Sequence, residues 1–306
     1  MLIRALILFC TIVPFAPIGL FAQGGSEIFI ARLRQQDAHI RVDTILRLTN
    51  RVGYDNQPAF FTGGRVLYTM IDSTARADIW QMDIERRTPG PVTRTNPESE
   101  YSATPIPGSD RFSVVRVEAD STQRLWSFAA DGSDARILLS DIKPVGYHLW
   151  LDENQLALFV LGNPATLQIA DVRTGKARTI ASNIGRALQR IPNARAFSFV
   201  QRNTDSTLNI VRYDLTTGQT TILVRALPQN EYHVWLNDST LLSANNSVLY
   251  QWRRGDRGWI HVADLAGHAV NGITRLALSP EGNLLALVAV DPPVQTGQNP
   301  SPLVES

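Results

Sequence analysis

Short runs of apolar residues, separated by polar turns, recur along most of the chain. The clearest unit covers 54–95 and contains apolar runs at 54–61, 66–71, 79–84 and 92–95. Runs of this length, bounded by Gly, Asp, Ser and Thr, are typical of β-strands joined by turns. This unit therefore predicts four short strands that form one small sheet.

The same pattern returns at a regular interval. The turns expected between the first and second strands of each unit lie 40 to 46 residues apart, at Gly63, Ser109, Glu153, Asn193, Asp238 and Glu281. Four strands in each such unit are the sequence signature of a β-propeller. A four-stranded sheet has two apolar faces, and radial stacking of the sheets buries both.

The two ends of the repeat are incomplete in complementary ways. The last unit, 272–290, has two strands and stops, whereas 26–49 reads as the second half of a unit without its first half. We therefore expect an all-β, six-bladed β-propeller over 23–290, in which 26–49 completes the last blade. Pairing the N-terminal strands with the C-terminal strands would remove exposed sheet edges. The proline-containing segment 291–306 is predicted to be a disordered tail.

Residues 1–22 have the pattern of a signal peptide. One basic residue, Arg4, precedes an apolar run, and the small residue Ala22 stands where a peptidase could cut. The alternative is an uncleaved anchor, which would be the protein's one contact with a membrane. Pro14 and Pro17 interrupt the run and favour cleavage. We expect a periplasmic or secreted protein.

Composition narrows the class of partner. The 306 residues are 44% hydrophobic and 19% charged, which indicates a folded domain with a substantial core. The formal net charge is +1, and removal of 1–22 would bring it to 0. Because the chain offers no basic face, we expect no nucleic-acid partner. We expect a monomer without a cofactor.

Two segments resemble a known family. Ser279-Pro280-Glu281-Gly282, at a turn, and Asp78-Ile79-Trp80-Gln81-Met82-Asp83-Ile84, in a strand, are similar to the WD-repeat-like units of the TolB propeller family. At the level of the period, the resemblance covers about 26–290. It implies a six-bladed propeller, often periplasmic, that works by binding protein partners.

Aromatic and imidazole residues recur at the start of the predicted first strands. They are Tyr54, Tyr101, Tyr147, His148, Tyr232 and His233. Such a ring at one mouth of the central channel could hold a peptide or a glycan. The alternative is that these residues fill the inner corner of each blade. The histidines lack the local spacing of metal ligands, and we predict no metal site.

Asp-Ser-Thr occurs in three of the predicted turns between second and third strands, beginning at Asp72, Asp120 and Asp205. The carboxylates could contact a partner or a calcium ion. The alternative is that each one caps its own turn, because Asp and Ser side chains readily bind nearby backbone groups. We favour turn capping.

Motifs for catalysis are absent from the sequence. It contains no Gly-x-Ser-x-Gly elbow, no His-Glu-x-x-His helix and no phosphate-binding loop, and we predict no catalytic residue. The predicted function is therefore a non-catalytic scaffold in the cell envelope that binds a protein or peptide. The alternative is a propeller enzyme acting on glycans or lactones at the channel mouth. Several converging His, Asp or Glu side chains would favour the enzyme, and an apolar or Arg-lined mouth would favour binding.

Overall fold

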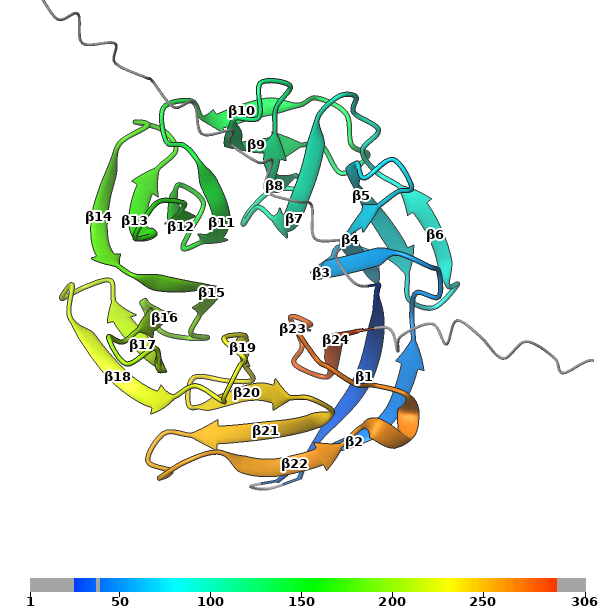
Figure 1. Cartoon of the computed structure of the whole chain (residues 1–306), viewed down its shortest axis with the longest axis vertical. Coiled ribbons are helices and arrows are strands. Elements are labelled where there is room, and N and C mark those ends of the chain that lie inside the picture. The colour runs from blue at the N-terminus through cyan, green and yellow to red at the C-terminus, as the bar shows by residue number, and fades with distance from the viewer. Residues whose placement is uncertain (1–24, 37–38, 291–306) are drawn as a thin grey trace, which may run out of the picture.

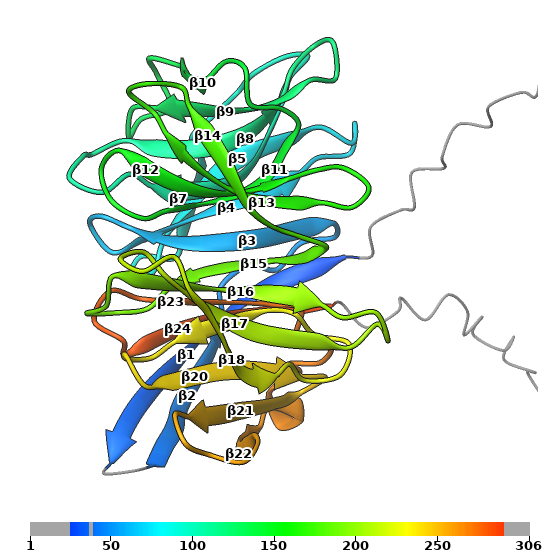
Figure 2. The ribbon, with the colours of Figure 1, turned by 90° about the vertical axis from the view of Figure 1, so that its left-hand side faces the viewer.

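The computed structural model describes residues 25–36 and 39–290, and in it the sheets stand around one axis as a ring (Figure 1). Seen from the side, the strands cross the thickness of the ring (Figure 2). The six-bladed propeller predicted from the repeat is confirmed. The predicted signal peptide and tail, 1–22 and 291–306, lie outside the described residues. No helix in the described ranges is long and apolar enough to cross a membrane.

Blades 1 to 5 are each built from four consecutive antiparallel strands. The strands of blade 1 are β3 (Tyr54–Phe61), β4 (Arg65–Ile71), β5 (Ala77–Asp83) and β6 (Thr88–Pro91). Those of blade 2 are β7 (Ser99–Pro105), β8 (Phe112–Val117), β9 (Gln123–Phe128) and β10 (Arg136–Leu139). Those of blade 3 are β11 (Val145–Trp150), β12 (Gln155–Val160), β13 (Thr166–Asp171) and β14 (Ala177–Ser182).

The remaining consecutive blades follow the same order from the axis outward. Blade 4 contains β15 (Ile184–Arg190), β16 (Ala196–Arg202), β17 (Leu208–Asp214) and β18 (Thr220–Arg225). Blade 5 contains β19 (His233–Trp235), β20 (Thr240–Asn245), β21 (Val248–Arg253) and β22 (Ile260–Asp264). A short 3-10 helix, η1 (Ala266–His268), connects blade 5 to the last strands.

Blade 6 combines both ends of the described chain, as predicted. Its strands are, from the axis outward, β23 (Arg275–Leu278), β24 (Leu284–Val290), β1 (Ser26–Gln36) and β2 (His39–Arg47). β1 pairs antiparallel with β24 from Ser26↔Val290 to Arg32↔Leu284. A single parallel bridge, Ser26↔Tyr54, also joins this blade to blade 1. The ring is therefore closed by hydrogen bonds between the N- and C-terminal strands.

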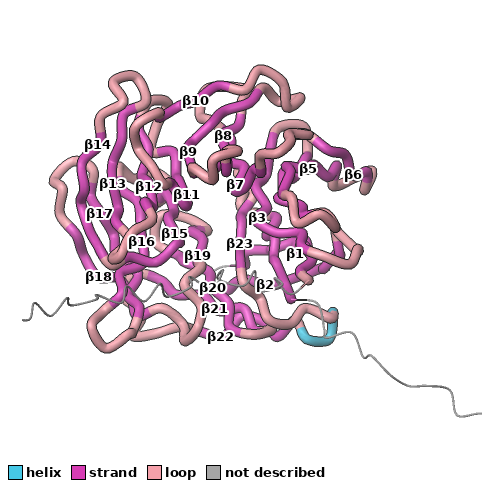
Figure 3. Tube along the Cα trace, turned by 45° about the horizontal axis from the view of Figure 1, so that its top comes forward, coloured by secondary structure: helices cyan, strands magenta, loops and turns pink. Residues whose placement is uncertain are grey.

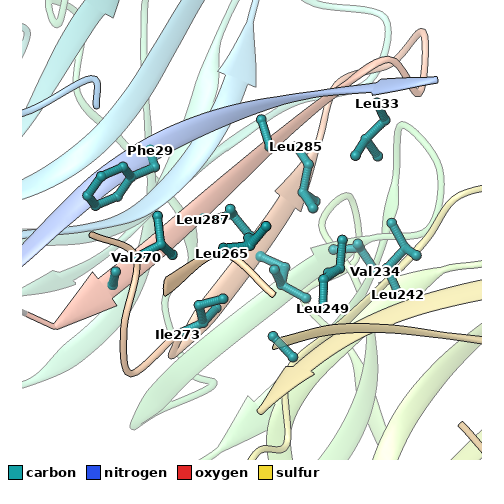
Figure 4. Close-up of a cluster of buried hydrophobic side chains, with 14 of the residues drawn as sticks. Phe29, Leu33, Val234, Leu242, Leu249, Leu265, Val270, Ile273, Leu285 and Leu287 are labelled. Atoms are coloured by element: carbon teal, nitrogen blue, oxygen red, sulfur yellow. The ribbon is translucent and has the colours of Figure 1, made fainter. Parts of the chain in front are cut away.

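The alternation of side chains along β1 explains why this strand closes the ring. Phe29 and Leu33 point toward blade 5, into a cluster that also contains Leu242, Leu249 and Leu285 (Figure 4). The neighbours Ile28 and Ile30 point the other way and pack with Val66 and Tyr68 of blade 1. One strand therefore contributes apolar surface to two blade interfaces, where its burial stabilises the fold by roughly 25 cal/mol per Å².

In blades 6 and 1, an acidic residue in the third strand interacts with a threonine that follows the fourth strand. Thr49 Oγ1 accepts a hydrogen bond from the backbone N–H of Ile28 at 2.9 Å and donates to the buried carboxylate of Glu27. The equivalent threonine of blade 1, Thr93, donates to Asp78 at 3.3 Å. An acidic residue and a later threonine are therefore the parts that tie the third strand of a blade to the segment after its fourth.

The Asp-Ser-Thr turns are capped by their own aspartates. The Oδ1 atoms of Asp72, Asp120 and Asp205 each accept a hydrogen bond from the backbone N–H two residues later, at 2.8, 2.9 and 3.0 Å. This is the geometry of an Asx turn. The turn-capping interpretation is confirmed.

Candidate binding site in the central channel

Two cavities lie along the axis of the ring. The larger one, about 1480 Å³, reaches from the beginnings of the innermost strands to turns such as Ser206–Thr207. The smaller one, about 360 Å³, is lined by the later residues of the same strands, including Phe60 and Leu278. Figure 3 shows the innermost strands that surround this channel. The channel therefore contains two cavities in which a ligand could bind.

Between the cavities lies a ring of six residues, one from each blade, which we call the channel waist. Its members are Gln57, Ser102, Tyr147, Arg186, Tyr232 and Arg275. All six line the smaller cavity, and all except Ser102 also line the larger one. Any molecule that enters the channel deeply would meet these side chains.

Irregular strand pairing positions several waist residues. The register of β3 with β4 shifts between Asn56 and Ala59, and Gln57 adopts a positive φ of 57°. In β7 the shift falls after Tyr101, and Ser102 has a φ of 55°. β11 and β15 also carry shifts beside their waist residues. Bulges redirect side chains locally, and here they do so at the level of the waist.

Arg275 reaches across the channel. Its Nη2 donates a hydrogen bond of 2.9 Å to Tyr147 Oη, although β23 and β11 belong to opposite blades of the ring. The guanidinium carbon lies 5.2 Å from the ring centroid of Tyr147 and 4.4 Å from that of Tyr232. Both distances fit a cation–π interaction. Arg275 and these two tyrosines therefore form the centre of the waist.

Two of the tyrosines near this arginine, Tyr54 and Tyr232, have raised pKa values and are neutral at physiological pH. Burial raises the pKa of Tyr54 to about 12, against a smaller opposing effect of Arg275. Burial also raises the pKa of Tyr232. These phenols can donate or accept hydrogen bonds, but they carry no negative charge that would neutralise the arginine.

The wall of the larger cavity is rich in arginine. It contains Arg186, Arg202, Arg225 and Arg275, but Glu231 is its one acidic residue in the described part of the chain. Glu231 accepts from Arg202 at 3.0 Å and from the backbone N–H of Arg186 at 3.0 Å. The site therefore has an excess of positive charge, although the whole chain is close to neutral.

The two predicted histidines point away from the channel axis. His148 Nε2 lies 2.7 Å from Ser113 Oγ in blade 2, and Trp150 Nε1 donates to the same oxygen at 2.9 Å. His233 and Trp235 bind Ser198 of blade 4 in the same way, each at 2.8 Å.

In each of these two Ser–His–Trp clusters, which we call the blade joints, the serine hydroxyl links two neighbouring blades. Ser113 Oγ donates to the backbone oxygen of Thr104 at 3.2 Å, so it accepts hydrogen bonds from both rings and His148 carries its proton on Nε2. Burial lowers the pKa of His148 to about 3 and that of His233 to about 4. Neutral, buried imidazoles that hold a serine match the alternative interpretation, in which they fill the inner corners of blades.

The six predicted site residues thus divide into three groups. Tyr54 and Tyr101 line the larger cavity, Tyr147 and Tyr232 belong to the waist, and the two histidines lie in blade interfaces. Whether the tyrosines bind a partner stays a prediction. No group of three or more His, Cys, Asp or Glu within 25–36 and 39–290 could hold a metal ion.

Sequence reasoning missed the waist arginines. Arg186 and Arg275 occupy the channel position of their blades, as Tyr147 and Tyr232 do in theirs, and each of the two arginines directly precedes an apolar residue of the innermost strand. Aligning the six repeats by position rather than by residue type would have found them. Gln57 and Ser102 depend on bulges, for which the sequence gives no comparable signal.

Comparisons with known proteins agree on the fold. No protein-family model and no curated protein matches the chain. A structure of a putative TolB from Agrobacterium tumefaciens aligns with a TM-score of 0.68 and 11% identity, over 88% of this chain and 99% of that one. TolB from Acinetobacter baumannii aligns with a TM-score of 0.57 and 10% identity, over 87% of this chain and 64% of that one.

An enzyme shares the same architecture. Oligogalacturonate lyase from Vibrio parahaemolyticus aligns with a TM-score of 0.55 and 10% identity, over 83% of each chain. Fold and channel together define this protein as a β-propeller with a central channel. More particularly, its fold is that of a TolB-like propeller. At these identities the likeness shows the fold alone, and function has to be argued from the site.

Proposed function

We propose that this protein is an exported, non-catalytic β-propeller that binds a protein or peptide partner in the cell envelope. The observation that carries the proposal is the channel waist, where tyrosines and arginines from several blades meet below a cavity of about 1480 Å³. Tyrosine and arginine are the residue types that dominate binding energy at protein interfaces. The signal-like segment 1–22 and the likeness of the fold to TolB propellers support the location.

The composition of the channel wall favours binding over the enzymatic alternative. Glycan or lactone chemistry would require several acidic or imidazole groups near one another. Along both cavities of the described structure, Glu231 is the one acidic residue and His148 the one histidine. Glu231 is paired with arginines, and His148 is held by Ser113. The channel therefore meets the Arg-lined expectation for a binding protein.

A peptide selection tests the proposal. Random peptides displayed on phage would be selected on the wild-type protein and on a variant with a bulkier side chain in the wall of the larger cavity, Leu161→Trp. Leu161 lines the larger cavity and is 40% exposed, so a larger side chain can be accommodated without repacking the core. The matched control is Ile137→Trp on the outermost strand β10, where Ile137 is 42% exposed.

We expect peptides to be enriched on the wild type and on Ile137→Trp, and to be lost on Leu161→Trp. If no peptide is enriched, or if Leu161→Trp retains the same peptides, the channel is not a peptide site. Fractionation of the native cell tests the location. The protein should be found outside the cytoplasm with an N-terminus at Gln23 or Gly24, whereas a cytoplasmic protein with an intact segment 1–22 would contradict export.

A further inference from the structure

Arg275 is a cation without a counter-charge at the centre of the channel. Among the residues that the structure describes, it forms no ion pair with a carboxylate, and its hydrogen bond goes to the hydroxyl of Tyr147. Arg186 and Arg202, by contrast, lie within 3.9 and 3.0 Å of Glu231. A partly buried charge without a partner is costly, and such groups are often reserved for a ligand.

The surroundings of Arg275 preserve its charge. Arginine remains protonated at neutral pH even when it is buried. The rings of Tyr147 and Tyr232 attract the guanidinium through their electron-rich faces, but they do not neutralise it. An anion that reached the waist would therefore meet a positive charge that no carboxylate of the described residues neutralises.

The dimensions of the site indicate a segment of a polymer rather than a small ion. The larger cavity, at about 1480 Å³, exceeds the roughly 300–1,000 Å³ of ordinary small-molecule pockets. Its wall also contains apolar residues, among them Leu161, Leu208 and Leu227. An inorganic anion would leave this apolar surface unused, whereas a polymer with mixed side chains would cover it.

A polypeptide fits this wall better than an acidic sugar chain. Sugar rings commonly stack on open aromatic faces. Here the guanidinium carbon of Arg275 lies over one face of Tyr147 and one face of Tyr232, 5.2 and 4.4 Å from the ring centroids. The waist therefore offers a planar hydrogen-bond donor, and Arg275 competes with a sugar ring for these two aromatic faces.

We propose that the channel waist recognises a carboxylate of an acidic polypeptide segment, with Arg275 as its principal partner and Arg186 beside it. The inference rests on the proposed function, because it names the chemistry of the peptide that the channel binds. A guanidinium can give two parallel N–H donors to one carboxylate, which supplies both strength and orientation. The other arginines of the larger cavity, Arg202 and Arg225, would attract acidic residues that flank this carboxylate.

Two labelled peptides that differ only in charge test the inference. One alternates Glu and Gly, and the other alternates Gln and Gly, each with a fluorescent group at its N-terminus. Binding is measured by fluorescence anisotropy on wild type, Arg275→Gln and Arg275→Lys. The control is Arg173→Gln, which removes an arginine that is 69% exposed on the turn between β13 and β14. Thermal unfolding of every variant checks that it is folded.

We expect the Glu peptide to bind the wild type more tightly than the Gln peptide, with an affinity that falls as salt is added. Arg275→Gln should weaken this binding roughly 10- to 100-fold, which corresponds to the loss of a charged hydrogen-bonded pair. Arg275→Lys should lie between the two, because it keeps the charge without the paired donors. Arg173→Gln should bind like the wild type.

Each of the other possible results contradicts one part of the proposal. Equal binding of Glu and Gln peptides, or full binding by a folded Arg275→Gln, would overturn carboxylate recognition and leave peptide binding in place. If the selection on the wild type also yields no peptide, the proposed function fails with it. Arg275-dependent binding of oligogalacturonate without binding of acidic peptides would overturn a polypeptide as occupant.

Discussion

Tyr147 and His148 are neighbours in one strand, yet they face different regions of the molecule. Tyr147 lies in the channel waist, whereas His148 is buried against Ser113 of the preceding blade. Tyr232 and His233 repeat this division. Successive side chains of a strand point to opposite sides. Two neighbouring residues can therefore contribute one side chain to the channel surface and the other to a blade joint.

The two regions differ in how much they tolerate substitution. At the channel position the repeats carry Gln, Ser, Tyr or Arg, so the surface varies from blade to blade around one backbone. In two blade interfaces, by contrast, the same three groups recur in the same geometry: a hydroxyl, an imidazole and an indole. The comparison teaches that substitutions in the channel should change binding, and substitutions in the joints should change stability.

The largest loss of stability should come from deletion of residues 26–49. β1 supplies apolar side chains to two blade interfaces and pairs with β24, so its loss exposes the edge of β24 and both clusters. We expect an open ring that aggregates. Size-exclusion chromatography and thermal unfolding measure the result, and a soluble, cooperatively melting product would contradict ring closure.

A smaller loss should follow Ser198→Ala. This change leaves Trp235 Nε1 and His233 Nε2 without their shared hydrogen-bond partner in a buried interface, at a cost of about 1–3 kcal/mol for each unpaired group. Chemical denaturation measures the free energy of unfolding. The matched channel variant, Tyr147→Phe, removes the hydroxyl that accepts from Arg275 Nη2. Both groups line a cavity in which water can replace the lost partner, so the loss should be smaller than for Ser198→Ala. Equal losses would remove the distinction between joint and channel.

Acidification from about pH 6.5 to pH 4 should lower the contribution of the joint histidines to the free energy of unfolding. In the folded protein the pKa of His233 is lowered to about 4 by burial, whereas an unfolded histidine has a pKa near 6.5. The unfolded state therefore binds more protons between these values, and stability falls as the pH drops from about 6.5 to 4. Each such histidine should contribute about 1 kcal/mol per pH unit in this interval.

The variant His233→Gln isolates this contribution. Its stability should depend less steeply on pH between about 6 and 5 than that of the wild type, by one proton. Asp55 acts in the opposite direction, because burial raises its pKa to about 6 and the folded state takes up its proton first. That effect is common to both proteins and cancels in the comparison. An unchanged slope would show that His233 titrates normally.

The smallest effect on stability is expected for Arg275→Gln. This substitution removes a partly buried charge that has no carboxylate partner, which costs a fold little or even stabilises it. We predict a change in the free energy of unfolding below about 1 kcal/mol by chemical denaturation. A loss as large as that of Ser198→Ala would place Arg275 among the structural residues.

The architecture was predictable because the turns and strands that define it recur in the sequence at a regular interval. The turn at Gly63 and its equivalents set the number of blades, and the incomplete units at 26–49 and 272–290 indicated how the ring closes. These signals are local: turn residues, strand alternation and a constant spacing. The structure confirmed them without a change in the number or order of blades.

The site was only partly predictable. The tyrosines repeat at one phase of the unit, so their approach to the channel could be expected. Arg275 could not be connected to Tyr147, because 128 residues separate them and their contact exists only in the closed ring. The histidines at the neighbouring phase were grouped with the tyrosines. Because neighbouring side chains of a strand point to opposite sides, tyrosines that face the channel leave His148 and His233 facing Ser113 and Ser198 in the blade interfaces.

The most direct test measures the affinity of the acidic peptide for Arg275→Gln and Ser198→Ala, at a temperature at which both are folded. The account predicts a roughly 10- to 100-fold loss for Arg275→Gln. Ser198→Ala, although the less stable of the two, should bind within about twofold of the wild type, because its affected groups lie away from the channel. Undiminished binding by Arg275→Gln, or an equal loss in Ser198→Ala, would contradict the assignment of binding to the channel waist.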